Sequence, residues 1–238
     1  MKAVILAAGR GTRMKHLTEE LPKPMIPVRG KPILERILQG LSSQAGVREF
    51  FILVGYRADV IQNYFGNGQS QGWNITYGKQ IVQDGTGRAV NYAKEWIGKD
   101  RFFLSYGDIL ITPQEYANCA QAFTEDGLIT VKKMSDTSQG GAVVFDENFY
   151  LKKIVEKSAL PTPSSWYNTG FYGFTSEIFH YIDQLKKSPR GEYELTDALN
   201  NMAQNGLKIK GFELTSFWAD VRDPEILEQL NQSADWYE

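Results

Sequence analysis

Glycines and basic residues follow directly after the first apolar stretch of the chain. Residues 4–8 are Val-Ile-Leu-Ala-Ala, the segment Gly9–Arg13 reads Gly-Arg-Gly-Thr-Arg, and Lys23 stands between two prolines about ten residues later. The apolar stretch is typical of a buried first strand in an α/β sheet. Glycines allow a sharp turn in which backbone N–H groups point toward an anion, and the basic side chains add positive charge. This pattern indicates a loop that binds a polyphosphate.

Two common phosphate-binding signatures are missing from this segment. No G-x-x-x-x-G-K-[ST] sequence occurs, and Met14 stands where the dinucleotide fingerprint G-x-G-x-x-G needs its last glycine. The loop is therefore neither the P-loop of kinases and ATPases nor a dinucleotide site. A lone G-x-G can be an ordinary turn, but Arg13 and the proline-flanked Lys23 favour phosphate binding.

The composition limits the classes of protein that this sequence can represent. The 238 residues are enough for one large α/β domain with a full core, and the formal net charge is −2 with a pI of about 5.8. A nucleic-acid-binding surface would need a basic excess, so we expect no nucleic acid partner. The single Cys119 cannot form an internal disulfide, and no apolar stretch approaches the roughly 18 residues of a membrane span. We therefore expect a cytoplasmic protein with no membrane partner.

Strand-like and helix-like patterns alternate in the first half of the chain. We expect strands at 49–54, 74–77 and 101–105 and helices at 57–65 and 88–97. This alternation predicts a mainly parallel sheet with helices on both faces. Ligands of such sheets bind beyond the carboxyl ends of the strands, where the glycine loop and Asp108 should both lie.

The second half reads as a series of strands with three helices. We expect strands at 128–134, 141–145, 150–155, 167–174 and 208–214 and helices at 176–185, 195–205 and 224–234. Gly206 is suited to end the second of these helices, and Asp223 is a plausible N-cap of the third.

Several motifs together resemble the signature of the sugar-1-phosphate nucleotidylyltransferases, closest in pattern to the uridylyl- and thymidylyltransferases. The motifs are Leu6–Met14, Leu21–Met25, Gly30–Leu34, Asp108, Glu156-Lys157, Asn168-Thr169-Gly170 and Trp218-Ala219-Asp220. The resemblance implies a Rossmann-like α/β fold with a mixed, mainly parallel sheet flanked by helices, in a single catalytic domain over residues 1–238. Some members continue into a left-handed β-helix, for which we expect no room here.

The resemblance also implies the reaction, in which a sugar phosphate oxygen attacks the α-phosphorus of a nucleoside triphosphate and pyrophosphate leaves. Two polyanions must meet, so the main task is to neutralise charge. Mg²⁺ suits this task, and the implied ligands are Asp108 and Asp220. From the residues alone, Asp108 is equally consistent with a strand-end turn, and Asp220 with a turn or cap before the last helix.

Three cations have roles that the resemblance implies. Lys23 should contact the nucleotide phosphates, Arg13 the β- and γ-phosphates, and Lys157 the phosphate of the sugar. Each is otherwise consistent with an ordinary surface residue. Family members often have proline after the Glu-Lys pair, and this chain has Ser158 there.

The resemblance also implies the residues that contact the base and the sugar. The expected nucleotide-binding residues are Leu6, Ala7, Ala8, Gly9, Gly11, Thr12, Gln80, Gly85 and Thr86, and the expected sugar-binding residues are Gly141, Glu156, Asn168 and Gly170. Gln80 carries both a donor and an acceptor, as recognition of the imide edge of uracil or thymine requires. Thr86 is equally suited to be the N-cap of the helix that follows.

Alternatives remain open at this point. UTP and dTTP are the favoured donors, but a cytidylyltransferase acting on a sugar phosphate or on phosphocholine also fits, with Trp166 and Tyr167 as aromatic contacts for a quaternary ammonium. A regulatory homologue that binds nucleotide-sugars without turnover is a further alternative. The sequence leaves the sugar and any homo-oligomer undetermined.

Overall fold

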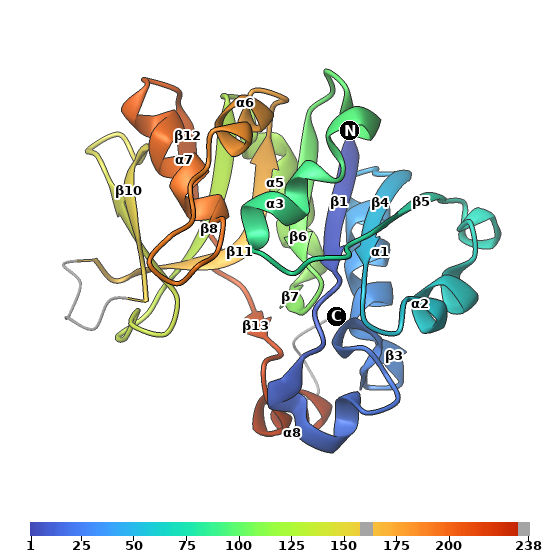
Figure 1. The fold of residues 1–238 in the computed structure, drawn as a ribbon. Coiled ribbons are helices and arrows are strands. Elements are labelled where there is room, and N and C mark those ends of the chain that lie inside the picture. The colour runs from blue at the N-terminus through green and yellow to red at the C-terminus, as the bar shows by residue number, and fades with distance from the viewer. Residues whose placement is uncertain (158–163, 233–238) are drawn as a thin grey trace. The chain divides into compact units, whose positions relative to one another are not determined.

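The computed structural model describes residues 1–157 and 164–232 (Figure 1). The chain divides into two compact units, each built from separate segments of the sequence. The first unit comprises Met1–Gln83, Leu104–Asn118 and Ser216–Glu238, and the second comprises Asp84–Phe103 and Cys119–Thr215. We describe each unit separately.

The first unit is organised around three parallel strands that lie side by side in Figure 1, β1 (Lys2–Ala7), β4 (Glu49–Val54) and β5 (Asn74–Lys79). Strand β6 (Phe102–Tyr106) follows on the other edge of β1. The neighbours Phe50 and Phe51 are both buried, so both faces of β4 are covered. The three parallel strands end in register, which brings the segments after them to one edge of the sheet.

The remaining elements of the first unit follow these strands. They are η1 (Thr12–Thr18), η2 (Lys23–Met25), β2 (Pro27–Val28), β3 (Lys31–Pro32), α1 (Ile33–Gln44), α2 (Ala58–Phe65), η3 (Gln69–Gln71), β7 (Ile109–Ile111), β13 (Trp218–Asp220) and α8 (Pro224–Gln232). Helix α5 (Pro113–Ala122) begins in the first unit and ends in the second. The antiparallel pairing of β13 with β7 brings a late segment of the chain beside Asp108.

The second unit is built on five strands, β8 (Gly127–Lys133), β9 (Gly141–Phe145), β10 (Leu151–Glu156), β11 (Trp166–Phe174) and β12 (Ile209–Glu213). Their order is β10-β9-β11-β8-β12, and only the β12–β8 pair is parallel. The sheet is therefore mixed, as the sequence predicts.

The helices of the second unit are α3 (Thr86–Asn91), α4 (Lys94–Ile97), α6 (Ile178–Asp183) and α7 (Leu195–Gln204). Helix α7 packs on β10, where the Asn200 amide pairs with both backbone groups of Ile154 at 2.7 and 3.0 Å.

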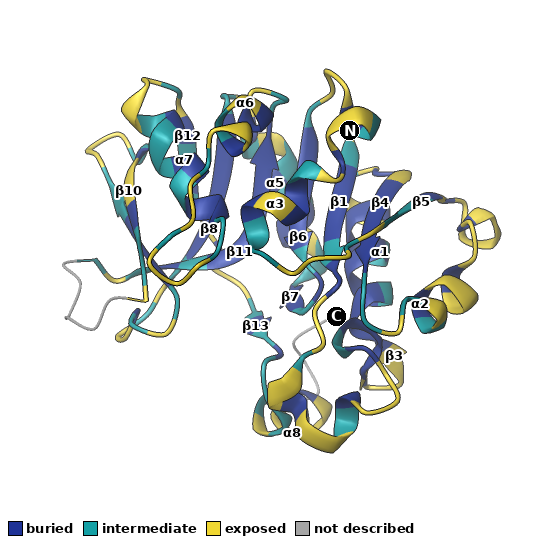
Figure 2. Cartoon of the chain, viewed as in Figure 1, coloured by how far each residue is buried: buried dark blue, intermediate teal, exposed yellow. Residues whose placement is uncertain are grey.

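Aromatic side chains fill the core of the second unit. Phe102 stacks on Phe179 with ring centres 5.7 Å apart, and Phe103 stacks on Phe171 at 5.3 Å. Figure 2 shows β6, β8 and β11 largely buried, whereas parts of the connecting loops are exposed. Cys119 is fully buried in α5. Within the described residues, no helix is both long and apolar enough to cross a membrane.

Most predicted elements are confirmed with small shifts at their ends, but the helix predicted at 88–97 is wrong as one element. It is divided into α3 and α4, because Ala93 bonds back only three residues to Val90. Asp223 caps α8 as predicted, accepting from the Ile226 amide at 3.0 Å. The last two residues of the helix predicted to end at 234 lie outside the described residues.

Candidate active site

The glycine-rich loop begins where β1 ends and enters η1. Gly11 has a φ of +69°, a conformation that L side chains rarely adopt. A Cβ atom at Gly11 would lie 2.7 Å from Cβ of Lys23. Glycine at this position therefore allows the loop and the proline-flanked lysine to pack directly against each other.

The end of β4 holds the same loop in place. The Ala8 carbonyl accepts from the Tyr56 amide at 3.2 Å and from the Gln83 side chain at 2.9 Å. A Cβ atom at Gly55 would lie only 2.7 Å from that carbonyl oxygen, so this close approach needs glycine. Ala8 is buried and supports the loop by its backbone.

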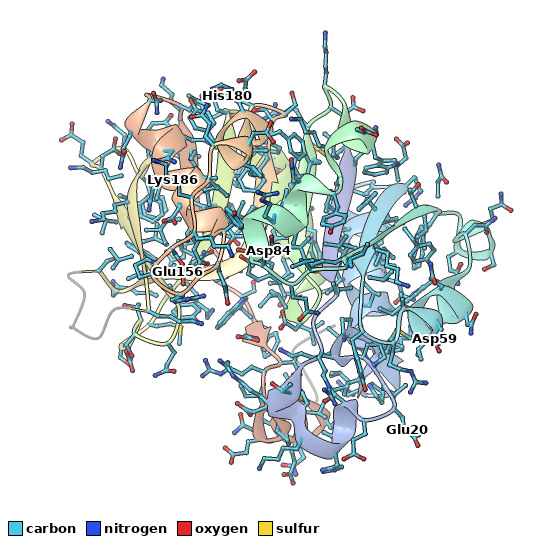
Figure 3. The ribbon with its side chains drawn as sticks, viewed as in Figure 1. Glu20, Asp59, Asp84, Glu156, His180 and Lys186 are labelled. Carbon is cyan, nitrogen blue, oxygen red and sulfur yellow. The ribbon has the colours of Figure 1, made fainter. Side chains whose placement is uncertain are left out.

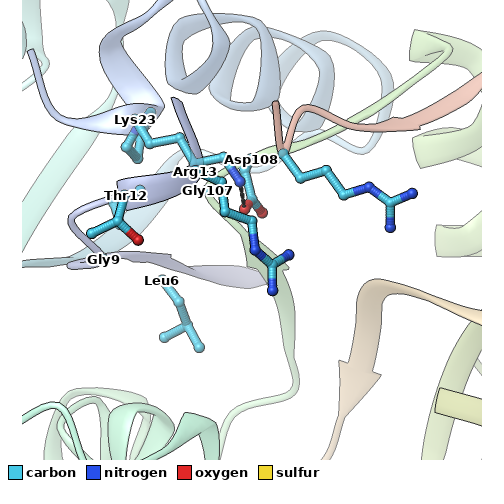
Figure 4. A pocket seen from close by; sticks show the side chains of 11 residues that line it. Leu6, Gly9, Thr12, Arg13, Lys23, Gly107 and Asp108 are labelled. Carbon is cyan, nitrogen blue, oxygen red and sulfur yellow. Dashed lines mark hydrogen bonds and ion pairs between the residues drawn. The ribbon is translucent and has the colours of Figure 1, made fainter. Parts of the chain in front are cut away.

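A cavity of about 260 Å³ opens beside the loop (Figure 4). It is lined by Leu6, Ala7, Gly9, Gly11, Thr12, Arg13, Lys23, Pro24, Gly107, Asp108 and Arg222. All of these except Pro24, Gly107 and Arg222 are residues that the sequence predicts for nucleotide, phosphate or metal binding. The structure therefore gathers most of the predicted residues of the first unit in one place.

The two predicted metal ligands both lie next to Lys23. The Lys23 ammonium forms an ion pair with Asp108, drawn as a dashed line in Figure 4, and lies 3.8 Å from Asp220. The Val221 amide donates to the Asp108 carbonyl at 3.0 Å, and β13 pairs Asp220 with Ile109. Backbone pairing thus fixes the two aspartates as neighbours.

Burial and repulsion by a neighbouring carboxylate disfavour the charged form of Asp220. Burial, followed by the charge of Asp108, raises the pKa of Asp220 to about 6, against the opposing effect of Lys23. A divalent cation would relieve this repulsion. No group of three or more histidine, cysteine, aspartate or glutamate side chains suited to a metal occurs in the described part of the chain. Two carboxylates are nevertheless a sufficient protein contribution for Mg²⁺, which keeps several waters.

Arg222 lines the cavity but is absent from the predicted site. The available signal is its position two residues after Asp220, at the end of a strand. The Arg222 amide donates to the Asp220 carbonyl at 2.8 Å, so the chain turns directly after β13, and Arg222 lines the same cavity.

The predicted sugar-binding residues of the second unit converge on Gly141. Strand pairing sets Gly141 opposite Glu156. A Cβ atom at Gly141 would lie 3.1 Å from Oε1 of Glu156 and 3.3 Å from Cβ of Asn168. Glycine leaves space between a carboxylate and an amide, and both groups can bind sugar hydroxyls.

Hydrogen bonds orient the Asn168 amide. Its nitrogen donates to the Tyr172 hydroxyl at 2.8 Å, and its oxygen accepts from the Gly170 amide at 3.3 Å. Gly170 has a φ of +82°, which lets its N–H turn back toward this side chain.

The charge of Glu156 depends on residues at the start of α7. Burial raises the pKa of Glu156, and the neighbouring charge of Glu194 raises it further. Arg190 and Lys157 act in the opposite direction. Glu194 is buried and accepts from Ser188 at 3.0 Å, with Arg190 at 3.3 Å. Glu156 is labelled in Figure 3.

Lys157 follows β10 in a left-handed conformation with a φ of +41°, which is uncommon for a residue other than glycine. Its amide donates to the Gly140 carbonyl at 2.8 Å, which holds this turn. The side chain is exposed. Ser158, where the chain departs from the family pattern, lies outside the described residues.

The residues predicted to bind the base fall in different places. Gln80 follows β5 in the first unit, where its amide donates to the Val54 carbonyl at 2.8 Å. Gly85 and Thr86 begin α3 in the second unit. Thr86 is not the N-cap, because Gly85 takes that position and the Thr86 hydroxyl accepts from the Leu195 amide at 3.1 Å.

Taken separately, the units offer two kinds of chemistry. The first unit presents a cationic, glycine-lined cavity with two adjacent carboxylates, which suits a polyphosphate and a divalent cation. The second unit presents a carboxylate, an amide and a nearby lysine, which suits a phosphorylated polyol.

Comparison with known proteins agrees with this chemistry. Residues 2–235 match the family described as "Nucleotidyl transferase". The chain is 37% identical over 231 residues to the "Bifunctional protein GlmU" of Methanocaldococcus jannaschii, covering 96% of this chain and 53% of that protein. It is 31% identical over 236 residues to the "UTP--glucose-1-phosphate uridylyltransferase AglF" of Haloferax volcanii, covering 98% and 96%. The chain spans about half the length of the GlmU proteins it matches.

Solved structures show the same fold. A putative glucose-1-phosphate thymidylyltransferase from Bacillus anthracis superposes with a TM-score of 0.86 at 27% identity, covering 97% of this chain and 94% of that one. The fold class predicted from the sequence, a mixed, mainly parallel sheet flanked by helices, is confirmed. The family match over nearly the whole chain and these relatives show that the protein belongs to the nucleotidyl transferase family.

Proposed function

We propose that this protein transfers a nucleotidyl group from a nucleoside triphosphate, with UTP or dTTP favoured, to a sugar 1-phosphate. The observation that carries the proposal is the cavity beside the glycine loop, where Lys23 and Asp108 meet and Asp220 adjoins. An anion-binding loop beside a pair of carboxylates is what a metal-assisted reaction at a phosphate requires.

The nucleotide phosphates would bind the residues of this cavity. Backbone N–H groups of Gly9, Gly11 and Thr12 would surround the phosphates, and Arg13 would stabilise the charge of the departing pyrophosphate. Lys23 would contact the α-phosphate region where charge builds up during attack. The reaction needs no covalent intermediate with the protein, because the sugar phosphate oxygen is itself the nucleophile.

Asp108 and Asp220 would hold Mg²⁺. The residues fit, because Asp108 and Asp220 lie close together beside Lys23, and burial followed by the charge of Asp108 raises the pKa of Asp220. When bound, the ion would supply positive charge that neutralises the phosphates and would act as a Lewis acid.

The sugar 1-phosphate would bind in the second unit. Glu156 accepts hydrogen bonds from vicinal hydroxyls, Asn168 donates and accepts, and Gly141 and Gly170 supply space and a backbone donor. Lys157 would bind the phosphate of the sugar. It is an exposed cation, and its backbone forms a left-handed turn directly after β10.

We propose Leu6, Ala7 and Gln80 of the first unit, and Gly85 and Thr86 of the second unit, as residues that contact the donor base. A relative covered over 96% of its length is named as acting on UTP and glucose 1-phosphate, and a similar structure is titled a putative thymidylyltransferase. Both names support a uracil or thymine nucleotide. We further propose that residues 1–238 act as one catalytic domain in the cytoplasm.

The phosphocholine alternative receives no support from the aromatic residues. Trp166 and Tyr167 are consecutive in β11, so their side chains point to opposite faces of the sheet. Trp166 packs against Phe145 and Phe149, and Tyr167 is buried. The two rings do not form the cage that a quaternary ammonium needs.

Pyrophosphate release with Mg²⁺ tests the proposal. UTP, dTTP, CTP, GTP and ATP are each paired with a panel of sugar 1-phosphates and with phosphocholine. We expect turnover with UTP or dTTP and one sugar 1-phosphate, and a loss of at least about 10²-fold in Asp108→Asn. Asp59→Asn is the matched control, because Asp59 is an exposed aspartate of the same unit. If no pair of substrates releases pyrophosphate but the protein still binds nucleotide-sugars, the protein would instead be a regulatory homologue.

A further inference from the structure

Arg222 is fixed at the wall of the cavity by its backbone. Its amide donates to the Asp220 carbonyl at 2.8 Å, and the preceding Val221 is fully buried and bonded to the Asp108 carbonyl. Asp223 then caps α8. The segment cannot move away without breaking these contacts, so the backbone position of Arg222 is set by the same pairing that places Asp220.

The charge of Arg222 acts on the buried Asp220, as do the charges of Lys23 and Arg13. Among the charged lining residues, Lys23 is engaged with Asp108 and also faces Asp220. Arg222 lies 3.8 Å from Asp223, whose side chain is 37% exposed and already caps a helix. An exposed pair at this distance contributes little.

Arg13 is the other lining guanidinium, and within residues 1–157 and 164–232 the structure gives it no ion pair or hydrogen bond. Two guanidinium groups therefore line one small cavity, and both act on Asp220 together with Lys23. These three cations outnumber the two carboxylates Asp108 and Asp220, so positive charge remains for a polyanion. A guanidinium presents a rigid set of donors that matches two phosphate oxygens at once, and it stays charged at any working pH.

We propose that Arg222 binds the polyphosphate of the nucleotide, sharing with Arg13 the charge of the pyrophosphate that leaves. This inference rests on the proposed function. It assigns a further substrate-binding residue to the reaction, on a segment where the sequence predicts only a metal ligand and a helix cap.

Binding of inorganic pyrophosphate tests the assignment without turnover. Titration calorimetry in EDTA measures the Kd of pyrophosphate for the wild-type protein, Arg222→Gln, Arg222→Lys and Arg57→Gln. Arg57 is the matched control, because it is a partly exposed arginine of the same unit that does not line the cavity. We expect Kd to rise about tenfold in Arg222→Gln and less in Arg222→Lys, with no change in Arg57→Gln.

Steady-state kinetics separate the possible failures. In Arg222→Gln we expect a higher KM for the nucleoside triphosphate and an unchanged KM for the sugar 1-phosphate. An unchanged pyrophosphate Kd, or a rise only in the sugar KM, would overturn the role of Arg222 and leave the proposed function standing. A wild-type protein that neither binds pyrophosphate nor turns over would contradict the proposed function itself.

Discussion

The guanidinium of Arg10 lies over the ring of Tyr56, 5.3 Å from its centre. The hydroxyl of the same tyrosine donates to the carbonyls of Thr18 and Glu19 at 3.0 and 2.9 Å. Tyr56 therefore contacts the glycine-rich loop near its start and again after η1. One side chain at the end of β4 braces the whole segment that would surround the phosphates.

Removing the hydroxyl should loosen this brace. In Tyr56→Phe we expect the unfolding free energy to fall by about 1 kcal/mol and the KM for the nucleoside triphosphate to rise about fivefold, with kcat little changed. Steady-state kinetics and urea unfolding measure both effects. Tyr64→Phe is the control, because the Tyr64 hydroxyl bonds Glu35 on the surface of the same unit. Equal KM changes in both variants would contradict the role of Tyr56.

Asp220 should make the metal-free protein less stable as the pH rises. Its pKa is raised from 3.8 to about 6 in the folded state, so the folded protein favours the protonated carboxyl. Its contribution to stability is fully present below pH 4 and is lost as the pH passes 6, at a cost of at most about 3 kcal/mol.

Thermal unfolding of the wild-type protein and of Asp220→Asn, compared in EDTA between pH 4 and 8, tests this dependence of stability on pH. We expect the Tm of the wild type to fall relative to Asp220→Asn across this range, and added Mg²⁺ to restore the wild type alone at pH 7.5. Parallel curves for the two proteins would show that Asp220 is not the group responsible.

Glu194 should set the pH range in which Glu156 binds the sugar. Glu194→Gln removes a negative charge and frees Arg190, and both changes lower the pKa of Glu156. We expect the acidic limb of sugar 1-phosphate binding, followed as KM against pH, to move to lower pH. Glu192→Gln is the control, since Glu192 pairs with the same arginine. An identical shift in the control would assign the effect to Arg190 instead.

Gly85 should tolerate no side chain. Its φ is +122°, and a Cβ atom would lie 2.5 Å from the backbone nitrogen and oxygen of Tyr193. We expect Gly85→Ala to reduce the unfolding free energy by about 3 kcal/mol or more, measured by urea unfolding. Gly72→Ala, in the left-handed helical region with a φ of +73° and with open space around it, should cost only about 1 kcal/mol.

Strands such as β1 and β4 could be predicted from the sequence because each is a short apolar run. Strand β9 is found at Gly141–Phe145, as expected from its apolar residues. Helix α1 is absent from the predicted elements, although Ile33, Ile37 and Leu41 recur at helical spacing and are fully buried. Its signal is present in the sequence. The three-residue strands β7 and β13 have no comparable signal, because their pairing joins distant segments.

The candidate site could also be predicted only in part, because contacts between distant segments leave no local signal in the sequence. Arg13, Lys23 and Asp108 could be predicted because residue type and local spacing carry their chemistry, and the structure brings them into one cavity. Glu194 could not be distinguished from Glu192 in the sequence. Only the packing of α7 on β10 buries Glu194 and lets its charge act on Glu156.

The unit that contains Asp108 is assembled from three separate stretches of sequence, the last of which begins at Ser216. A ribosome makes the chain from its N-terminus, so β13 emerges long after β7 has been synthesised. Until then Asp108 has Lys23 but lacks its neighbour Asp220, and Arg222 is missing from the wall of the cavity. Contacts between such distant segments form late because a long loop must close first. A nascent chain therefore acquires its complete phosphate-binding cavity only after the stretch that begins at Ser216 has been synthesised.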